Sequence, residues 1–202
     1  MKRLAAALLL PLALLVARPA VAVDVDQARM LVRSAANDSL AAFAGKKQTP
    51  AESQAALRQI ISRYSDMDTV SRYLLGRYWS RASPEVRQEF SGLLKRFLIT
   101  AFGGLIKDVA SDDRIEIKGA EVQGDRVVVH SLSLSVGEDP TPVDWVVADT
   151  TAGHPVIVDL SVDGVTVVTT MQADFTSVIR SAGGKLEALF EPLRRKINSL
   201  DG

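Results

Sequence analysis

Few side chains in this 202-residue chain could carry out nucleophilic or acid–base chemistry. The sequence has no cysteine, and its two histidines, His130 and His154, are not at the close spacing of a metal-binding pair. His154 lies in a Gly-His-Pro turn, where a solvent-exposed position accounts for it. We therefore expect no metal site and no cofactor.

One combination of residues could exchange a proton. His130 alternates with Val128 and Leu132 on the apolar side of a strand-like segment, and Asp144 and Asp159 lie in later segments of the same kind. Such a histidine and carboxylate could act as acid and base in a cone-shaped α+β pocket. A hydrogen-bonded structural histidine is the commoner outcome, and the alternation favours solvent-facing positions for both aspartates. We expect that the protein is not an enzyme and keep catalysis by His130 as an alternative.

Charge and glycine placement bear on other classes of ligand. The chain has 24 basic and 24 acidic residues and no basic run, which predicts no nucleic-acid binding. Gly183-Gly184 follows a helical pattern rather than forming a phosphate-binding loop. Gly103-Gly104 interrupts a helical pattern, which either close helix packing or the approach of a ligand would explain.

The first 22 residues have the pattern of a secretory signal peptide. Lys2 and Arg3 precede an apolar stretch from Leu4 to Val16, and Ala20-Val21-Ala22 resembles a cleavage site. The apolar stretch is too short for a membrane span, which needs about 20 residues. We predict cleavage after Ala22, export to the periplasm and a mature chain with 21 basic and 24 acidic residues.

Helical periodicity dominates the first half of this mature chain. Helix starts are indicated by Asp24, by the capping box at Thr49-Pro50-Ala51-Glu52, by Asp66 and by Ser83-Pro84. Gly76 is expected to end the third helix. The longest helix begins at Ser83-Pro84 and carries a wide apolar face.

The pattern changes to strand-like alternation after residue 113. Strands are predicted around residues 115–117, 127–136, 143–148, 156–162 and 165–171, and Asp163-Gly164 forms a tight hairpin between the last two. The alternation places Val158 and Leu160 on one face of their strand. A helix over 172–182 and a last helix, kinked or delayed by Pro192, are expected to follow.

Helices followed by strands indicate the α+β class. We predict a helical N-terminal half packed on a twisted four- to five-stranded antiparallel sheet, with C-terminal helices. No repeat, low-complexity segment or linker divides the chain, so residues 23–202 are predicted to form a single domain.

Two blocks of sequence resemble one known family. The first reads DMDTVSRYLLGRYW over 66–79 and continues as ASPEVRQEF over 82–90. The second comprises Val143-Asp144-Trp145, Val158-Asp159-Leu160, DGVTVVTT over 163–170, and Asp174-Phe175 and Ser177–Arg180 before Gly183-Gly184. In order and spacing these blocks are similar to the MlaC/toluene-tolerance family of periplasmic phospholipid-binding proteins. Thr166, His154-Pro155 and Pro192 depart from the family pattern and are consistent with a divergent branch.

The resemblance implies a carrier that shuttles phospholipids between the outer membrane and an inner-membrane ABC transporter with an MCE-domain ring. Such a carrier maintains outer-membrane lipid asymmetry and also meets an outer-membrane lipoprotein complex. A carrier of hopanoids or other lipids is an alternative within the family. An enzyme using His130 and an adaptor that binds only protein are the alternatives outside it. We expect a monomer.

The predicted lipid-binding residues are aliphatic or aromatic and come from one helix and four strands. They are Leu94, Phe97, Ala101, Leu105, Val128, Leu132, Leu134, Trp145, Val147, Val158, Leu160, Val162, Val165 and Val167. A dry core has the same composition as a cavity for acyl chains, so both interpretations stay open for this set. Arg77, Arg81 and Arg87 are predicted to contact a partner protein, with a solvated charged surface as the alternative.

Overall fold

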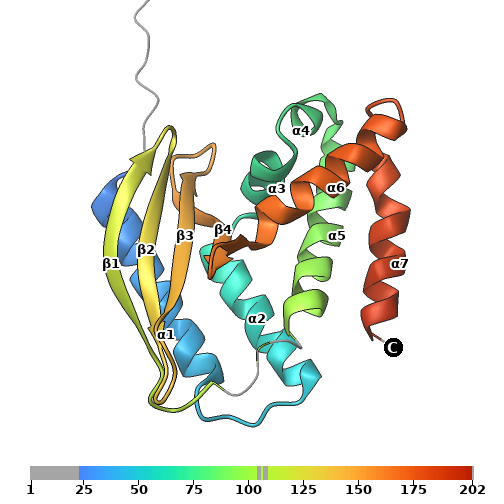
Figure 1. The fold of residues 1–202 in the computed structure, drawn as a ribbon. Helices are drawn as coiled ribbons and strands as arrows, with labels where there is room; N and C mark the ends of the chain where they lie inside the picture. The colour runs from blue at the N-terminus through green and yellow to red at the C-terminus, as the bar shows by residue number, and fades with distance from the viewer. Residues whose placement is uncertain (1–22, 104–105, 107–108, 202) are drawn as a thin grey trace, which may run out of the picture.

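The computed structural model describes residues 23–103, 106 and 109–201, and it confirms the α+β class. An antiparallel sheet lies at one side of the molecule with helix α1 against it, and the other helices form a bundle beside the sheet (Figure 1). The predicted signal peptide, its cleavage site and Leu105 lie outside the described residues.

Helices α1, α2, α3 and α5 begin where the capping residues predict, whereas α6 begins at Val167, before the predicted start at residue 172. The helices are α1 (Val25–Phe43), α2 (Pro50–Tyr64), α3 (Met67–Leu75), α4 (Arg77–Arg81), α5 (Pro84–Gly103), α6 (Val167–Ser181) and α7 (Phe190–Asp201). The side chain of Asp24 accepts a hydrogen bond from Gln27 N, and Thr49 forms the complete capping box with Glu52. At the start of α3, the side chain of Asp66 accepts a hydrogen bond from Thr69 N. A short 3₁₀ turn, η1 (Leu186–Leu189), precedes α7, so the α-helix starts late, just before Pro192.

The sheet is a five-stranded meander in the order β1-β2-β3-β4-β5. Its strands are β1 (Arg114–Gln123), β2 (Arg126–Leu134), β3 (Thr141–Asp149), β4 (Pro155–Val162) and β5 (Val165–Thr166). Asp163 and Gly164 both have positive φ, 49° and 78°, as the predicted two-residue hairpin requires. The predicted strand over 165–171 is wrong beyond Thr166, because the chain enters α6 at Val167.

Two buried clusters lie on opposite sides of the sheet. One joins α1 to the sheet through Ala28, Val32, Val127 and Val129. The other fills the bundle of α3, α5, α6 and α7 and receives Val158 from β4. Each cluster is apolar and close-packed, so the sheet is fixed by α1 on one face and, at its β4 end, by the bundle on the other.

Close helix packing accounts for Gly103, the last residue of α5. A Cβ atom built there would lie 2.8 Å from Gln54 Cγ and 3.0 Å from Gln54 Cα. These contacts are too short for any larger residue, because α5 ends directly against α2. Of the two explanations left open by the sequence, the structure supports packing for Gly103. Gly104 lies outside the described residues.

Candidate functional site

Cross-strand pairing divides the apolar residues of the sheet between two faces. Val127 pairs with Val147 and Val129 pairs with Trp145, and these side chains lie on the face that packs against α1. We call this the α1 face. Val128 pairs with Val146, which contacts the helical bundle, so this pair lies on the other side, which we call the bundle face.

The α1 face is a dry core. Val127, Val129 and Val147 are fully buried. Trp145 Nε1 donates a hydrogen bond of 3.0 Å to Ser131 Oγ, and Ser131 Oγ donates one of 2.7 Å to the carbonyl of Val143. The indole N–H and the hydroxyl are therefore both satisfied within the protein, as buried polar groups require.

Strand β2 buries side chains on both faces. Val128, Leu132 and Leu134 share one face, as their alternation predicts, and Val128 is buried there, but Val127 and Val129 are fully buried on the opposite face. Because residues 127–129 are all valine, either alternation places a valine on each face, and the local pattern does not predict which face packs against α1. Leu132 and Leu134 are half-buried on the bundle face.

A β-bulge separates Val158 from Leu160. Val146 pairs with Asp159 while the next residue, Val147, pairs with Ile157, so Val158 is the extra residue of β4. Val158 contacts the bundle cluster and Leu160 packs on the α1-face cluster. The prediction that the two side chains share a face is therefore wrong, because the bulge reverses the alternation.

Leu94, Phe97, Val158 and Val167 come together in or against the bundle cluster. Leu94 and Val158 are buried there, whereas Phe97 and Val167 are half-buried at its margin. A half-buried apolar side chain lacks neighbours on one side, so a ligand can gain contact with it without displacing the core. Ile61 of α2 and Phe102 of α5 share this position, and the sequence analysis missed both.

The rest of the predicted lipid-binding set is dispersed. Trp145, Val147 and Leu160 belong to or pack on the α1-face cluster. Val162 and Val165, at the Asp163-Gly164 hairpin, are 43% and 66% exposed. Ala101 is half-buried in α5. The described members of the set thus divide into core positions, exposed hairpin positions and half-buried positions on α5, on α6 and on the bundle face of β2.

Asp159 is buried, contrary to its predicted solvent-facing position, with only 2% of its surface exposed. Its Oδ1 accepts hydrogen bonds from the backbone N–H groups of Leu160 and Val168, at 2.8 and 2.7 Å. Its Oδ2 accepts from Thr169 N, at 3.0 Å, and from the Thr169 hydroxyl. A carboxylate at the first turn of a helix satisfies free N–H groups and favours the positive end of the helix dipole. Asp159 therefore fixes the start of α6 and ends β5 after two residues.

His130 is part of a polar group on the bundle face of β2. Its Nδ1 lies 2.8 Å from Asp144 Oδ1, and its Nε2 lies 3.8 Å from Glu121 Oε1. The His130 and Asp144 side chains are each 39% exposed, so Asp144, unlike Asp159, is partly solvent-facing. The pair has the geometry of a base and its orienting carboxylate, but none of the hydrogen bonds described for the chain connects it to a hydroxyl nucleophile.

The three arginines predicted to contact a partner differ in their surroundings. Arg77 and Arg81 are exposed on α4. Arg87 is half-buried and donates hydrogen bonds of 2.9 Å to the carbonyls of Trp79 and Ser80, with its guanidinium over the Trp79 ring. Arg87 therefore joins α4 to α5, whereas the side chains of Arg77 and Arg81 are exposed to solvent.

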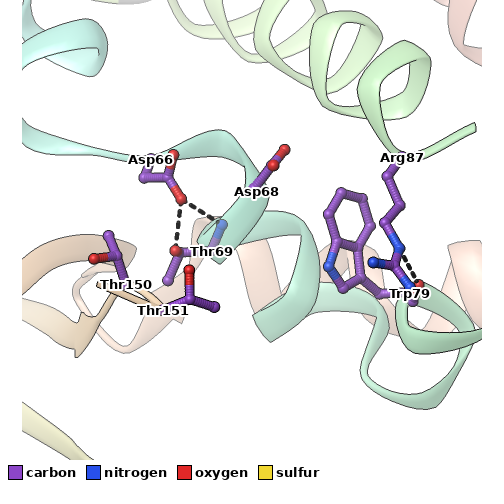
Figure 2. A pocket seen from close by; sticks show the side chains of 7 residues that line it. All are labelled: Asp66, Asp68, Thr69, Trp79, Arg87, Thr150 and Thr151. Atoms are coloured by element: carbon purple, nitrogen blue, oxygen red, sulfur yellow. Dashed lines mark hydrogen bonds between the residues drawn. The ribbon is translucent and has the colours of Figure 1, made fainter. Parts of the chain in front are cut away.

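A surface hollow of about 390 Å³ lies between the start of α3, Arg87 of α5 and the loop after β3. Figure 2 shows that Asp66 and Thr69, and Arg87 and Trp79, are hydrogen-bonded to each other, whereas Asp68, Thr150 and Thr151 make no bond to another residue drawn there. Asp66 accepts from the backbone and hydroxyl of Thr69, and Arg87 donates to Trp79. None of the predicted lipid-binding residues lines it. Its carboxylates and hydroxyls do not suit an acyl chain, since burial of such groups against hydrocarbon is costly.

Metal and membrane-spanning features were searched over the described ranges. Within them, no three histidine, aspartate or glutamate side chains are grouped in a way that would hold a metal ion. None of the helices there has the length and apolar character required to cross a bilayer.

Comparison with known proteins finds a matching protein family and similar solved structures. A family model described as MlaC protein matches residues 33–195. Among solved structures, the phospholipid-binding protein from Ralstonia solanacearum, in complex with a phospholipid, is similar with a TM-score of 0.73 and 25% sequence identity. The similarity covers 87% of this chain and 99% of that one. No curated protein sequence matches the chain.

Proposed function

Because the chain belongs to the MlaC family, we propose that it is a periplasmic carrier that encloses the acyl chains of a phospholipid. The observation that carries the proposal is the phospholipid bound to the Ralstonia solanacearum protein, which shares the fold over nearly its whole length. The proposal gives His130 no catalytic part.

We place the acyl chains between the bundle face of the sheet and helices α2 and α5. The half-buried apolar residues support this position: Phe97, Ala101 and Phe102 of α5, Ile61 of α2, and Leu132 and Leu134 of β2. The buried residues Leu94, Val128 and Val158 would form the floor behind them. In the sequence, Leu105 continues the apolar spacing that begins at Ser83-Pro84. The α1 face, with Trp145 and Val147, then serves as the core that holds the sheet.

The energetics of lipid transfer require such a protein. A two-chain lipid with about 30 methylenes would cost roughly 24 kcal/mol if its tails entered water, at about 0.8 kcal/mol per methylene. An apolar cavity offers the tails an environment like the bilayer, so exchange between the two is close to neutral. The direction of transport therefore comes from the partners.

The remaining parts of the proposal concern the cell. Residues 1–22 direct export and are removed after Ala22, and residues 23–202 form the single lipid-binding domain. The carrier shuttles between an outer-membrane lipoprotein complex and an inner-membrane MCE/ABC transporter, and it maintains outer-membrane lipid asymmetry. Exposed Arg77 and Arg81 contact one of these partners.

Organic extraction and mass spectrometry of protein purified from the periplasm of a Gram-negative host test the binding. We expect phospholipid in a stoichiometric amount, and the spectrum distinguishes it from a hopanoid. Folded protein that repeatedly carries no lipid would refute the carrier function.

A matched pair of variants tests the position of the chains. Leu132→Asp places a carboxylate among the tails, where its desolvation costs several kcal/mol. Each 1.4 kcal/mol is about tenfold in affinity, so lipid content should fall below about a tenth of wild type. Val136→Asp, at a position that is 76% exposed just beyond β2, is the control and should keep its lipid. Circular dichroism checks that both variants fold, and equal lipid in both would exclude the proposed position.

A further inference from the structure

A band of polar side chains crosses the bundle face of the sheet from β1 to β4. His130 pairs with Asp144, and Asp144 pairs with Ser161, so these three side chains lie on the same side of the sheet. Glu121 pairs with Val128 of that face, and its Oε1 lies 3.8 Å from His130 Nε2. We call Glu121, His130, Asp144 and Ser161 the polar band.

The carboxylates of the polar band have unused hydrogen-bond acceptors. Asp144 Oδ1 lies 2.8 Å from His130 Nδ1, and Glu121 Oε1 accepts from the side-chain amide of Gln123. None of the hydrogen bonds described for the chain reaches Asp144 Oδ2 or Glu121 Oε2. Within the described residues, no lysine or arginine nitrogen lies within 4.0 Å of either carboxylate. Two carboxylates beside one imidazole therefore keep a net negative charge, whether or not the ring is protonated.

Ser161 is the buried member of the polar band. It is only 7% exposed, and it lies directly across from Asp144 on the same face. None of the hydrogen bonds described for the chain involves its hydroxyl, although a buried hydroxyl normally has a partner. Cross-strand neighbours have Cβ atoms about 4.5–5.5 Å apart. The unused hydroxyl of Ser161 and the unused oxygen of Asp144 therefore lie beside each other, as two sides of a polar site.

The polar band adjoins the proposed acyl-chain site. Leu132 lies two residues beyond His130 on the same face of β2, and side chains at this spacing are about 7 Å apart. The side chains of His130 and Asp144 are each 39% exposed, so a ligand can reach them. A phospholipid whose chains contact Leu132 would therefore have its headgroup within reach of the polar band.

We propose that the polar band binds the ammonium group of an amine-bearing phospholipid headgroup, as in phosphatidylethanolamine. The proposal rests on the carrier function proposed above. A primary ammonium group has a positive charge and three N–H donors, which match the unused oxygens of Asp144 and Glu121 in charge-assisted hydrogen bonds. When His130 Nδ1–H donates to Asp144, Nε2 is a further acceptor. A choline group has the charge but no N–H donor, and a glycerol headgroup has no positive charge, so both bind more weakly.

The test compares wild-type protein with two double variants that lose the same charge. Glu121→Gln with Asp144→Asn removes the carboxylates of the polar band, and Glu138→Gln with Glu187→Gln removes two exposed carboxylates outside it. Each protein is incubated with vesicles that contain equal amounts of phosphatidylethanolamine, phosphatidylcholine and phosphatidylglycerol. It is then repurified and extracted, and mass spectrometry measures the amount of each bound lipid.

We expect wild type and the control variant to hold phosphatidylethanolamine in excess over both other lipids. In the polar-band variant this excess should fall at least about tenfold, because charge-assisted hydrogen bonds are lost. Equal amounts of the three lipids in wild type would overturn the proposal, as would equal changes in both variants. Phosphatidylethanolamine and phosphatidylcholine bound equally and above phosphatidylglycerol would also overturn it, since repulsion of anionic lipid alone gives that result.

The total phospholipid bound per protein tests the carrier function separately. It depends on the apolar site, so we expect the same total in all three proteins. A normal total without a preference for phosphatidylethanolamine would refute the ammonium site and leave the carrier function intact. Absence of lipid from all three proteins would refute the carrier function, and the ammonium site with it.

Discussion

Asp159 connects β4 to the first turn of α6, and its replacement by asparagine tests how that helix is held. The carboxylate accepts four hydrogen bonds, two of them from the backbone N–H groups of Val168 and Thr169. In Asp159→Asn one oxygen remains and an NH₂ group takes the place of the other. That NH₂ group would face the N–H and hydroxyl of Thr169, which donated to the lost oxygen.

The expected loss of stability follows from these bonds. Hydrogen bonds to a charged acceptor contribute about 1.5–3 kcal/mol and neutral ones about 0.5–1.5 kcal/mol. The variant loses the bond from the Thr169 N–H, replaces the one from the Thr169 hydroxyl by a neutral bond that this hydroxyl accepts, and weakens those to Leu160 and Val168, while it avoids burying a charge. We expect a net decrease of about 2–3 kcal/mol in the free energy of unfolding. With a urea m-value of about 2 kcal/mol/M, the midpoint should fall by about 1–1.5 M.

Urea unfolding at neutral pH, followed by circular dichroism, measures this change. Asp163→Asn is the matched control, because Asp163 is exposed in the hairpin turn and asparagine also tolerates its positive φ. The control midpoint should stay at the wild-type value. If Asp159→Asn unfolds at the same urea concentration as this control, the carboxylate does not hold α6.

Two further predictions concern helix packing and pH. Gly103→Ala forces a contact with α2 and should lower the free energy of unfolding by about 1–3 kcal/mol. Gly92→Ala has nothing within 4 Å of the new Cβ and should raise the free energy of unfolding by about 0.5–1 kcal/mol. Thermal unfolding distinguishes the two variants, and equal effects would contradict the close approach of α5 to α2. Hydrogen bonds from Tyr64 and then Arg63 lower the pKa of Asp38 below 3.8. Asp38 thus stabilises the fold above this pH and loses its effect as the pH falls through the lowered pKa. The free energy of unfolding, measured from pH 6 to pH 2, should fall more steeply for wild type than for Asp38→Asn. Parallel curves for the two proteins would refute this assignment.

Local interactions explain why the sequence predicts so many element boundaries. An N-cap such as Asp24 or Asp66 acts on backbone groups two or three residues away, so its partner is already in the local sequence. The Asp163-Gly164 hairpin is equally local, since it needs only two residues that accept positive φ. In each case the residue type and the backbone geometry that it stabilises lie within one turn of chain.

The errors arise where the outcome depends on contacts distant in sequence. The strand-like run from Val165 becomes helical because Asp159, on the preceding strand, caps the chain at Val168 and Thr169. The bulge at Val158 changes which side chains of β4 face the bundle, and alternation alone carries no sign of it.

The same dependence decides which apolar residues are available to a lipid. Trp145 and Leu132 look equivalent in the sequence, because each belongs to an alternating apolar strand. In the fold, Trp145 is buried on the α1 face and hydrogen-bonded to Ser131, whereas Leu132 is half-buried on the bundle face. A residue that already contacts the core on all sides can gain little from a ligand, while a half-buried residue can gain dispersion contacts and lose contact with water. Because the faces are assigned by register and by the β4 bulge, the proposed lipid site follows from the pairing of the strands rather than from their hydrophobicity.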